Sequence, residues 1–494
     1  MNQQKPLQIG QSDFRELRRA NGYYVDKSMF IEQVINAAAL VMLLPRPRRF
    51  GKTLNLSMLR YFFEKTDEDN SALFDGLAIK ETPLSDQHQG QYPVIYMTLK
   101  DVKSRNWQAC FDQIREMIHQ LYLQHTYLLD GDLLHDQEKS EFNKVISLDD
   151  SPRVYQNALK NLSNFLHRHH QQKVVILIDE YDTPIQSGYS NNYYDEVISF
   201  MRNFLSGGLK DNPHLFKGVL TGILRVAKES IFSGLNNLGV YTLLSDKFSD
   251  VFGFTEADVS GLLAYYNLSN YYEEVADWYN GYLCGKTVLY NPWSVLNYID
   301  NEHTAKLYWL NTGDSSLIDQ LVTRGGQELR GELLKLLDND VITKPIYDNI
   351  VMRDLEQRDN LLWSFLLFSG YLKASAQPVR RNWYNLSIPN QELRHIYEGM
   401  VERWFEMNVR LNNLESLLIA LERGDVRLFE RMLRQIVKEI MSYHDFGGQP
   451  EKVYQALVLG MLVWLSDKYE IRTNRESGYG LSLYTFPSPP NTPQ

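Results

Sequence analysis

Two stretches of this 494-residue chain carry side chains suited to phosphate chemistry. In the first, residues 40–44 form an aliphatic run, and Gly51-Lys52-Thr53 then opens a segment with apolar residues at helical spacing. A helix N-terminus offers unpaired N–H groups and a positive dipole, a lysine adds charge for the β- and γ-phosphates, and a hydroxyl can bind Mg²⁺. The pattern therefore predicts a strand, a phosphate-binding loop and a helix, with Lys52 and Thr53 in the last two roles.

The loop departs from the usual pattern G-x-x-x-x-G-K-[ST], because Arg46 stands where glycine is expected and Pro47 follows it. A bare Gly-Lys-Thr is weak support on its own, since the same tripeptide recurs at residues 285–287. That second copy precedes the extended run 288–290 and does not open a helix. We therefore do not expect it to bind phosphate.

The second stretch is LIDEYDTPI, which ends an aliphatic run at residues 174–178. Such a run is typical of a strand buried on both faces of a parallel sheet, and ligands of open α/β sheets bind at the carboxyl ends of the strands. Asp179 is placed there to hold the Mg²⁺ shell, and Glu180 to polarise the attacking water as general base. Acids in a plain surface turn would give the same pattern, but two such elements in this order favour a nucleotide site.

Composition sets the broad class of the protein. With 44% hydrophobic and 23% charged residues the chain is ordinary for a globular protein of several domains. A formal charge of −10 argues against non-specific coating of nucleic acid, although a local basic groove stays open. Two cysteines predict a reduced, cytoplasmic setting. The N-terminus lacks a signal-peptide pattern and no apolar run is long enough to span a bilayer, so we expect a soluble protein without a membrane partner.

Further apolar runs at residues 92–99 and 215–223 alternate with helical stretches at 107–127 and 154–169. Alternation of strand and helix implies a parallel sheet with crossover helices. We therefore predict an α/β fold for residues 1–254, with a P-loop NTPase-type parallel sheet and flanking helices.

Four segments, FRELRRANGYYVDKSMFI, RPRRFGKTLNLSML, LIDEYDTPI and TGILRVAKESIFSGLNN, resemble the AAA-ATPase-like proteins that carry a C-terminal PD-(D/E)XK nuclease domain. In that family arginine and proline are usual in the phosphate loop, so Arg46 no longer counts against the assignment. The resemblance implies ATP and Mg²⁺ as cofactors. It also implies that Thr221 senses the γ-phosphate and that Arg225 is a candidate for the γ-phosphate charge, although Arg225 could equally pair with Asp182.

The predicted site can be stated residue by residue. We expect nucleotide contacts from Arg48, Arg49, Phe50, Gly51, Lys52, Thr53, Asp179 and Thr221, a nucleotide-bound Mg²⁺ held by Thr53 and Asp179, and catalysis by Glu180 and Arg225. Arg48 and Arg49 could instead be solvated turn residues. Positive charge strengthens anion sites at helix N-termini, so we expect at least one of them to contact phosphate.

Beyond the sheet, residues 255–390 are predicted to form a helical lid or a winged-helix-like domain. A hairpin is expected from residues 370–374 and 383–388, and the stretch 271–299 is rich in tryptophan and tyrosine. Aromatic residues at this density usually build a core rather than a platform for nucleic-acid bases.

Residues 391–480 resemble a nuclease-like α+β region, in which a helix carries Glu451 towards the metal and residues 469–474 form the first strand. The metal-binding aspartate and the Glu-x-Lys pair of that family do not follow, because the sequence continues as LSLYTFPSPPNTPQ. We therefore expect a truncated nuclease-like domain without nuclease activity, a first strand without sheet partners, and a Pro-rich disordered tail at residues 481–494.

Two classes of function fit these features. The first is an ATPase that uses hydrolysis to drive a conformational change, and Glu180 favours it. The second is an ATP-binding switch or degenerate gene product without significant turnover, or a nucleic-acid-associated module. DNA or RNA, a second copy of the chain and another protein stay open as partners besides the nucleotide.

Overall fold

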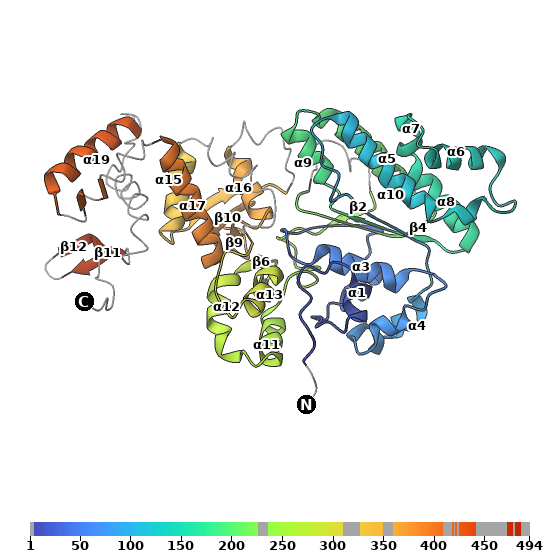
Figure 1. Cartoon of the computed structure of the whole chain (residues 1–494), viewed down its shortest axis with the longest axis horizontal. Coiled ribbons are helices and arrows are strands. Elements are labelled where there is room, and N and C mark those ends of the chain that lie inside the picture. The colour runs from blue at the N-terminus through green and yellow to red at the C-terminus, as the bar shows by residue number, and fades with distance from the viewer. Residues whose placement is uncertain are drawn as a thin grey trace. The chain divides into compact units, whose positions relative to one another are not determined.

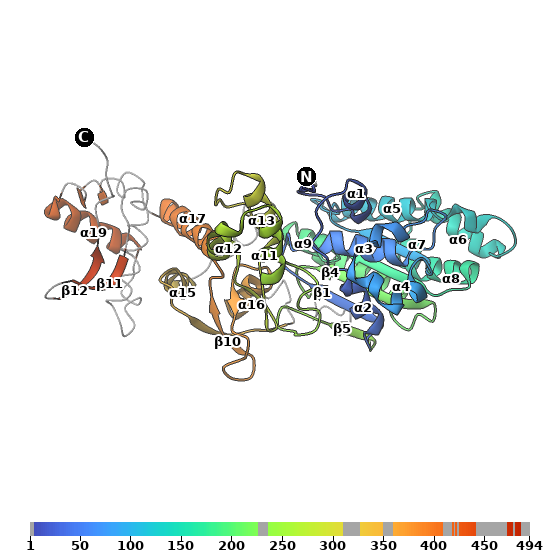
Figure 2. The same ribbon diagram turned by 90° about the horizontal axis from the view of Figure 1, so that it is seen from below.

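The computed structural model describes residues 4–225, 236–309, 327–348, 359–408, 417–418, 420–421, 424–440, 472–477 and 480–485. The chain divides into two compact units (Figures 1 and 2). The first unit comprises Met1–Trp309 and Lys344–Asn390, and the second comprises Leu310–Thr343 and Gln391–Gln494. Most of the expected middle domain, residues 255–309 and 344–390, therefore belongs to the same unit as the sheet.

A five-stranded parallel sheet forms the core of the first unit. Its spatial order is β2 (Val94–Thr98), β3 (Val174–Asp179), β4 (Leu215–Gly222), β1 (Val41–Pro45) and β5 (Leu238–Val240). Every residue of β1 and β3 is buried, as expected for strands covered on both faces. The predicted α/β fold class is confirmed.

Helices cover both faces of this sheet (Figure 1). One face carries α1 (Phe14–Arg19), α3 (Lys52–Phe63) and α4 (Pro83–His88), and the other carries α5 (Trp107–Leu123), α8 (Ala158–His170) and α10 (Tyr194–Leu209). The other helices of this region are α2 (Met29–Asn36), α6 (Asp136–Ile146), α7 (Pro152–Gln156) and α9 (Thr183–Ser190). Its 3-10 turns are η1 (Ser71–Phe74), η2 (Ala78–Glu81) and η3 (Thr126–Leu129).

The amphipathic pattern of the sequence explains how α8 packs. Leu159, Leu162 and Leu166 recur at helical spacing and are buried together with Phe165. The helix predicted over residues 154–169 is, however, interrupted at Asn157, where α7 ends and α8 begins. Local interruptions of this kind leave the hydrophobic period intact, so periodicity alone cannot locate them.

The strand order brings polar strand ends together. Strand β4 lies between β1 and β3, and it pairs Leu44 with Thr221 and Ile178 with Leu220. On the other side of β3, Thr98 pairs with Asp179. Because all these strands run in parallel, their carboxyl ends share one edge of the sheet.

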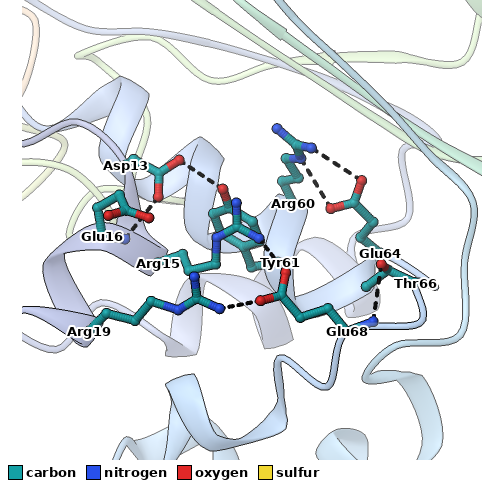
Figure 3. A network of polar contacts seen from close by, with 9 residues as sticks. All are labelled: Asp13, Arg15, Glu16, Arg19, Arg60, Tyr61, Glu64, Thr66 and Glu68. Atoms are coloured by element: carbon teal, nitrogen blue, oxygen red, sulfur yellow. Dashed lines mark hydrogen bonds and ion pairs between the residues drawn. The ribbon is translucent and has the colours of Figure 1, made fainter. Parts of the chain in front are cut away.

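Polar contacts fasten α1 to α3 (Figure 3). Asp13 caps α1 by accepting a hydrogen bond from the backbone N–H of Glu16 at 3.0 Å, and it also accepts one from the Tyr61 hydroxyl at 2.8 Å. Arg15 and Arg19 both pair with the exposed carboxylate of Glu68. Exposed ion pairs contribute little to stability. Glu68 also lies beyond the end of α3, so the direct tie between the two helices is the hydrogen bond from the Tyr61 hydroxyl to Asp13.

The segment that follows β5 packs into the first unit through an aromatic core. It contains α11 (Glu256–Tyr265), η4 (Ser269–Tyr271), α12 (Tyr272–Tyr279), the hairpin β6 (Tyr282–Cys284) with β7 (Thr287–Leu289), and α13 (Pro292–Asp300). Tyr279, Tyr290 and Tyr298 are fully buried in one cluster. The expectation that these aromatic residues build a core is confirmed for those three residues.

The remaining part of the first unit contains α16 (Asp359–Phe368), β9 (Lys373–Ala374) and β10 (Trp383–Ser387), and β8 (Ile342–Pro345) begins just before it. Strands β9 and β10 pair antiparallel, with Leu386 opposite Ala374. The predicted hairpin is thus confirmed. None of the described helices is long and apolar enough to cross a membrane.

The described parts of the second unit include α15 (Gln327–Leu337), α17 (Gln391–Asn408), α19 (Val426–Ile440), β11 (Arg472–Ser477) and β12 (Gly480–Thr485). Strands β11 and β12 pair antiparallel, so the expectation of a strand without sheet partners is wrong. Residues 481–485, which the sequence placed in the tail, supply the missing hydrogen bonds. Glu451 lies outside the described residues.

A half-buried histidine, His125, makes the stability of the first unit sensitive to acid. Burial, together with His170 and Arg60, holds the pKa of His125 at about 4, below its ordinary value of 6.5. The unfolded imidazole takes up a proton near pH 6.5 but the folded one does so only near pH 4, so stability is lost as the pH falls through this window. Between about pH 7 and pH 4.5, the free energy of unfolding in urea should fall by about 2 kcal/mol less for His125→Gln than for the parent.

The matched control is His395→Gln, which removes an exposed histidine. Its free energy of unfolding should fall by as much as that of the parent over the same pH range. Equal losses in the parent and in His125→Gln would contradict the assignment.

Candidate functional site

Arg46 occupies the loop position where glycine was expected, and it is fully buried. Its Nη1 donates to the carbonyl oxygens of Pro45 at 2.8 Å and Tyr241 at 2.7 Å, and its Nη2 donates to that of Phe248 at 2.6 Å. Its backbone N–H donates to Gly222 O at 2.9 Å. The side chain therefore turns into the protein and fastens the loop to a segment about 200 residues away, which gives the departure from glycine a structural cause.

The loop ends in a left-handed turn that opens α3. Gly51 caps the helix with φ of 79°, a value that favours glycine, and Asn55 N donates to Gly51 O at 3.0 Å. Arg49 also has a positive φ of 65°, which is strained for a residue with a side chain. The first N–H groups of α3 are thus presented at the carboxyl edge of the sheet.

Lys52 is buried at the start of α3. Its ammonium donates to the loop carbonyls of Arg46 at 3.1 Å and Pro47 at 2.8 Å, which uses two of its three N–H donors. Burial lowers the pKa of Lys52, while the negative charges of Glu180 and Asp179 oppose that shift. The lysine charge is therefore held inside the loop by acids at the end of β3.

Asp179 is the polar centre of the site and is fully buried. Its Oδ2 accepts hydrogen bonds from Thr53 Oγ1 at 2.7 Å and Thr98 Oγ1 at 3.4 Å, and its Oδ1 accepts one from Thr221 Oγ1 at 2.5 Å. Burial raises the pKa of Asp179, and the hydrogen bonds from Thr221 and Thr53 oppose the shift. The structure thus brings three predicted site residues, Thr53, Asp179 and Thr221, into one network.

Thr98 was not predicted as a site residue. Its signal in the sequence is a single polar side chain at the end of an otherwise apolar strand, which is too common to single out. The pairing of β2 with β3 is what places it opposite Asp179.

Glu180 follows Asp179 in a left-handed conformation, with φ of 50°. Strain of this kind in a residue with a side chain is concentrated at functional sites. The half-buried carboxylate accepts a hydrogen bond from Thr183 Oγ1 at 3.3 Å, and its charge acts on Lys52. The second acid of the motif therefore lies near the loop lysine.

Two tryptophans contact the arginines of the loop. The Arg49 guanidinium lies 4.3 Å from the centre of the Trp293 ring, within the range of a cation–π contact. Trp309 Nε1 donates to the carbonyl oxygen of Arg48 at 3.3 Å. The sequence assigned the aromatic stretch 271–299, which contains Trp293, to the core and gave no role to Trp309. These contacts were missed because nothing in a single sequence links residues so far apart.

Phe50 is buried rather than available to a ligand. Its ring packs edge to face on Tyr282 at 5.0 Å, and its carbonyl accepts a hydrogen bond from Gly253 N at 2.9 Å. Only its backbone N–H is therefore placed to serve in the loop.

Arg225 is half-buried, three residues beyond the end of β4. Among the described residues no ion pair joins it to Asp182, the alternative partner that the sequence left open. The Asp182 carboxylate instead accepts the backbone N–H groups of Ile223 and Leu224, each at 3.0 Å.

The second Gly-Lys-Thr copy lies in a different setting. It forms the turn between β6 and β7, with Gly285 at φ of 55° and the Lys286 side chain 71% exposed. It opens no helix, as the sequence predicted, and it offers no helix N-terminus to an anion.

Comparisons with known proteins add to this geometry. Residues 8–232 match the AAA-ATPase-like family model, described as a predicted AAA-ATPase. All the predicted site residues fall within this range. The nuclease-like reading of residues 391–480 falls outside the matched range and receives no support from it.

Two individual proteins are also similar to this chain. An uncharacterized protein in the vnfD 5′ region of Azotobacter chroococcum mcd 1 is 27% identical over 393 residues, which cover 79% of this chain and 68% of that protein. The Aeropyrum pernix ORC2 protein, solved in ADPNP-ADP complexes, aligns with 81% of this chain and 96% of its own at 11% identity and a TM-score of 0.25. That structural score is too low to inform on fold or function.

The two Gly-Lys-Thr copies provide a matched test of phosphate binding. We expect Lys52→Ala to weaken ATP binding by roughly 10- to 100-fold, because a charge-assisted contact to phosphate is lost. Lys286→Ala removes an exposed lysine from the same tripeptide and should leave the affinity unchanged. Isothermal titration of both variants would contradict the loop assignment if Lys52→Ala bound ATP as the parent does.

Proposed function

We propose that this chain binds ATP with Mg²⁺ at the carboxyl edge of its sheet and hydrolyses it. The observation that carries the proposal is the network in which Thr53 and Thr221 donate to the buried Asp179 beside Lys52. Three separate segments must converge to build it, and each supplies the group that phosphate and Mg²⁺ chemistry requires.

The residues present fit a triphosphate and its metal. The first N–H groups of α3, the Lys52 ammonium, and the guanidinium groups of Arg48 and Arg49 suit the negative phosphate oxygens. The Thr53 hydroxyl and the Asp179 carboxylate are the hard oxygen ligands that Mg²⁺ prefers. When bound, Mg²⁺ neutralises charge on the phosphate oxygens.

Glu180 is the acid best suited to accept a proton from the attacking water. Asp179 is engaged by three hydroxyls and Asp182 by backbone N–H groups, whereas Glu180 is half-buried with one long hydrogen bond from Thr183. Thr221 would contact the γ-phosphate, and Arg225 would stabilise the charge that develops on it.

The role of Glu180 as general base can be tested by replacing one of its carboxylate oxygens with an amide nitrogen. Glu180→Gln keeps the shape of the side chain but cannot take up the proton, so we expect kcat to fall about 10²- to 10⁴-fold while ATP affinity stays within about threefold of the parent. Phosphate release and isothermal titration measure the two quantities. Glu141→Gln, which alters a surface acid paired with Lys144, should behave as the parent does.

Equal turnover in Glu180→Gln and the parent would move the base elsewhere. ATP binding without turnover in the parent would instead favour the alternative function, a nucleotide-dependent switch.

A further inference from the structure

Residues 181–182, in the turn after β3, form several hydrogen bonds with residues 221–224 at the end of β4. The Tyr181 hydroxyl donates to Leu224 O at 2.6 Å, and Tyr181 N donates to Thr221 O at 3.0 Å. Asp182 Oδ2 accepts the backbone N–H groups of Ile223 and Leu224. Thr221, Ile223 and Leu224 are therefore hydrogen-bonded to two consecutive residues of the acidic motif.

These contacts are buried and leave no spare room. Tyr181 is 0% exposed and Asp182 is 1% exposed. A Cβ added to Gly222 would lie 2.4 Å from Asp182 Oδ1 and 2.9 Å from a ring carbon of Tyr181, closer than real Cβ atoms approach. The two segments are thus in direct contact, and glycine is required by this close approach rather than by its φ.

We propose that Tyr181 and Asp182 are positioning residues that hold Arg225 at the nucleotide, so that the chain supplies its own charge-stabilising arginine. The inference rests on the ATPase function proposed above. Thr221 is fixed at one end of the segment by its hydrogen bond to Asp179. Leu224 is fixed at the other end by its hydrogen bonds to Tyr181 and Asp182, which we call the clamp. Arg225 is the next residue, so its backbone leaves from a fixed point at the edge of the site.

The same geometry assigns Asp182 a role different from that of Glu180. Its Oδ2 accepts a third hydrogen bond, from Gln186 Nε2 at 2.8 Å, and burial raises its pKa while the N–H groups of Leu224 and Ile223 oppose that shift. With three donors on Oδ2, this oxygen serves the segment after β4 and α9 rather than the attacking water. Asp182 acts as an acceptor of backbone N–H groups, and the charge itself is not required.

The first experiment compares Asp182→Asn with Asp182→Ala. Asparagine keeps one acceptor oxygen for the N–H groups of Ile223 and Leu224, so we expect kcat within about threefold of the parent and an unchanged pH profile. Alanine removes the acceptor and should lower kcat at least about tenfold, with faster amide exchange at residues 223 and 224. An Asp182→Asn variant as inactive as Glu180→Gln would overturn the positioning role.

The second experiment tests whether the clamp acts through Arg225. Tyr181→Phe should lower kcat about three- to tenfold, with ADP affinity within about twofold of the parent. In an Arg225→Ala background the same change should have no further effect. The matched control is Tyr122→Phe, which removes a buried hydroxyl that donates to Ala158 O at 2.8 Å between α5 and α8, and it should leave kcat unchanged.

The third experiment distinguishes an arginine supplied within the chain from one supplied by a second copy. Lys52→Ala lacks the phosphate lysine but retains Arg225, whereas Arg225→Ala retains the lysine. Mixing the two variants should restore no activity if the arginine acts within its own chain. Recovery of turnover in the mixture would overturn the inference.

The inference and the proposed function fail in different ways. A parent that neither binds nor hydrolyses ATP would contradict the proposed function, and the inference with it. A parent that hydrolyses ATP, but in which Tyr181→Phe and Arg225→Ala lower kcat by independent factors, would overturn the inference alone.

Discussion

The buried carboxylate of Asp179 is the group on which the site depends. A buried charge is costly unless it is paired and hydrogen-bonded. The Asp179 carboxylate accepts hydrogen bonds from the hydroxyls of Thr53, Thr98 and Thr221, and the positive charge of Lys52 stabilises it. The hydroxyls come from α3, β2 and β4, while the carboxylate ends β3. The strand order that places β4 between β1 and β3 is therefore also the order that satisfies this carboxylate.

The phosphate loop is shaped by distant parts of the chain. Glycine in such a loop allows a tight turn, but here Arg46 reaches carbonyl groups of Tyr241 and Phe248, and Trp293 and Trp309 contact the two following arginines. The aromatic segment after β5 is thus part of the loop's support. A substitution in that segment would therefore alter the phosphate loop even though it replaces none of the residues proposed to contact phosphate.

The sequence predicts the elements of the site more readily than the contacts between them. Lys52 and Asp179 were identified because each follows an apolar strand, and apolar runs are local signals. Trp293 could not be assigned to the loop, and the clamp by Asp182 on Leu224 could not be foreseen, because these contacts join segments that no periodic pattern relates. The pairing of β11 with β12 was not predicted, because the prolines that exclude a core strand begin at Pro487, beyond the end of β12 at Thr485.

The strand order has a consequence for how the protein forms during synthesis. Strands β2 and β3 are neighbours and can pair once β3 has emerged, but the neighbours of β1 are β4 and β5, which are made much later. Until then the apolar β1 has no partner in the sheet, and its exposed edge is open to wrong pairing. The phosphate loop is therefore made well before the strands and side chains that complete its surroundings, which favours protection of the nascent chain by chaperones.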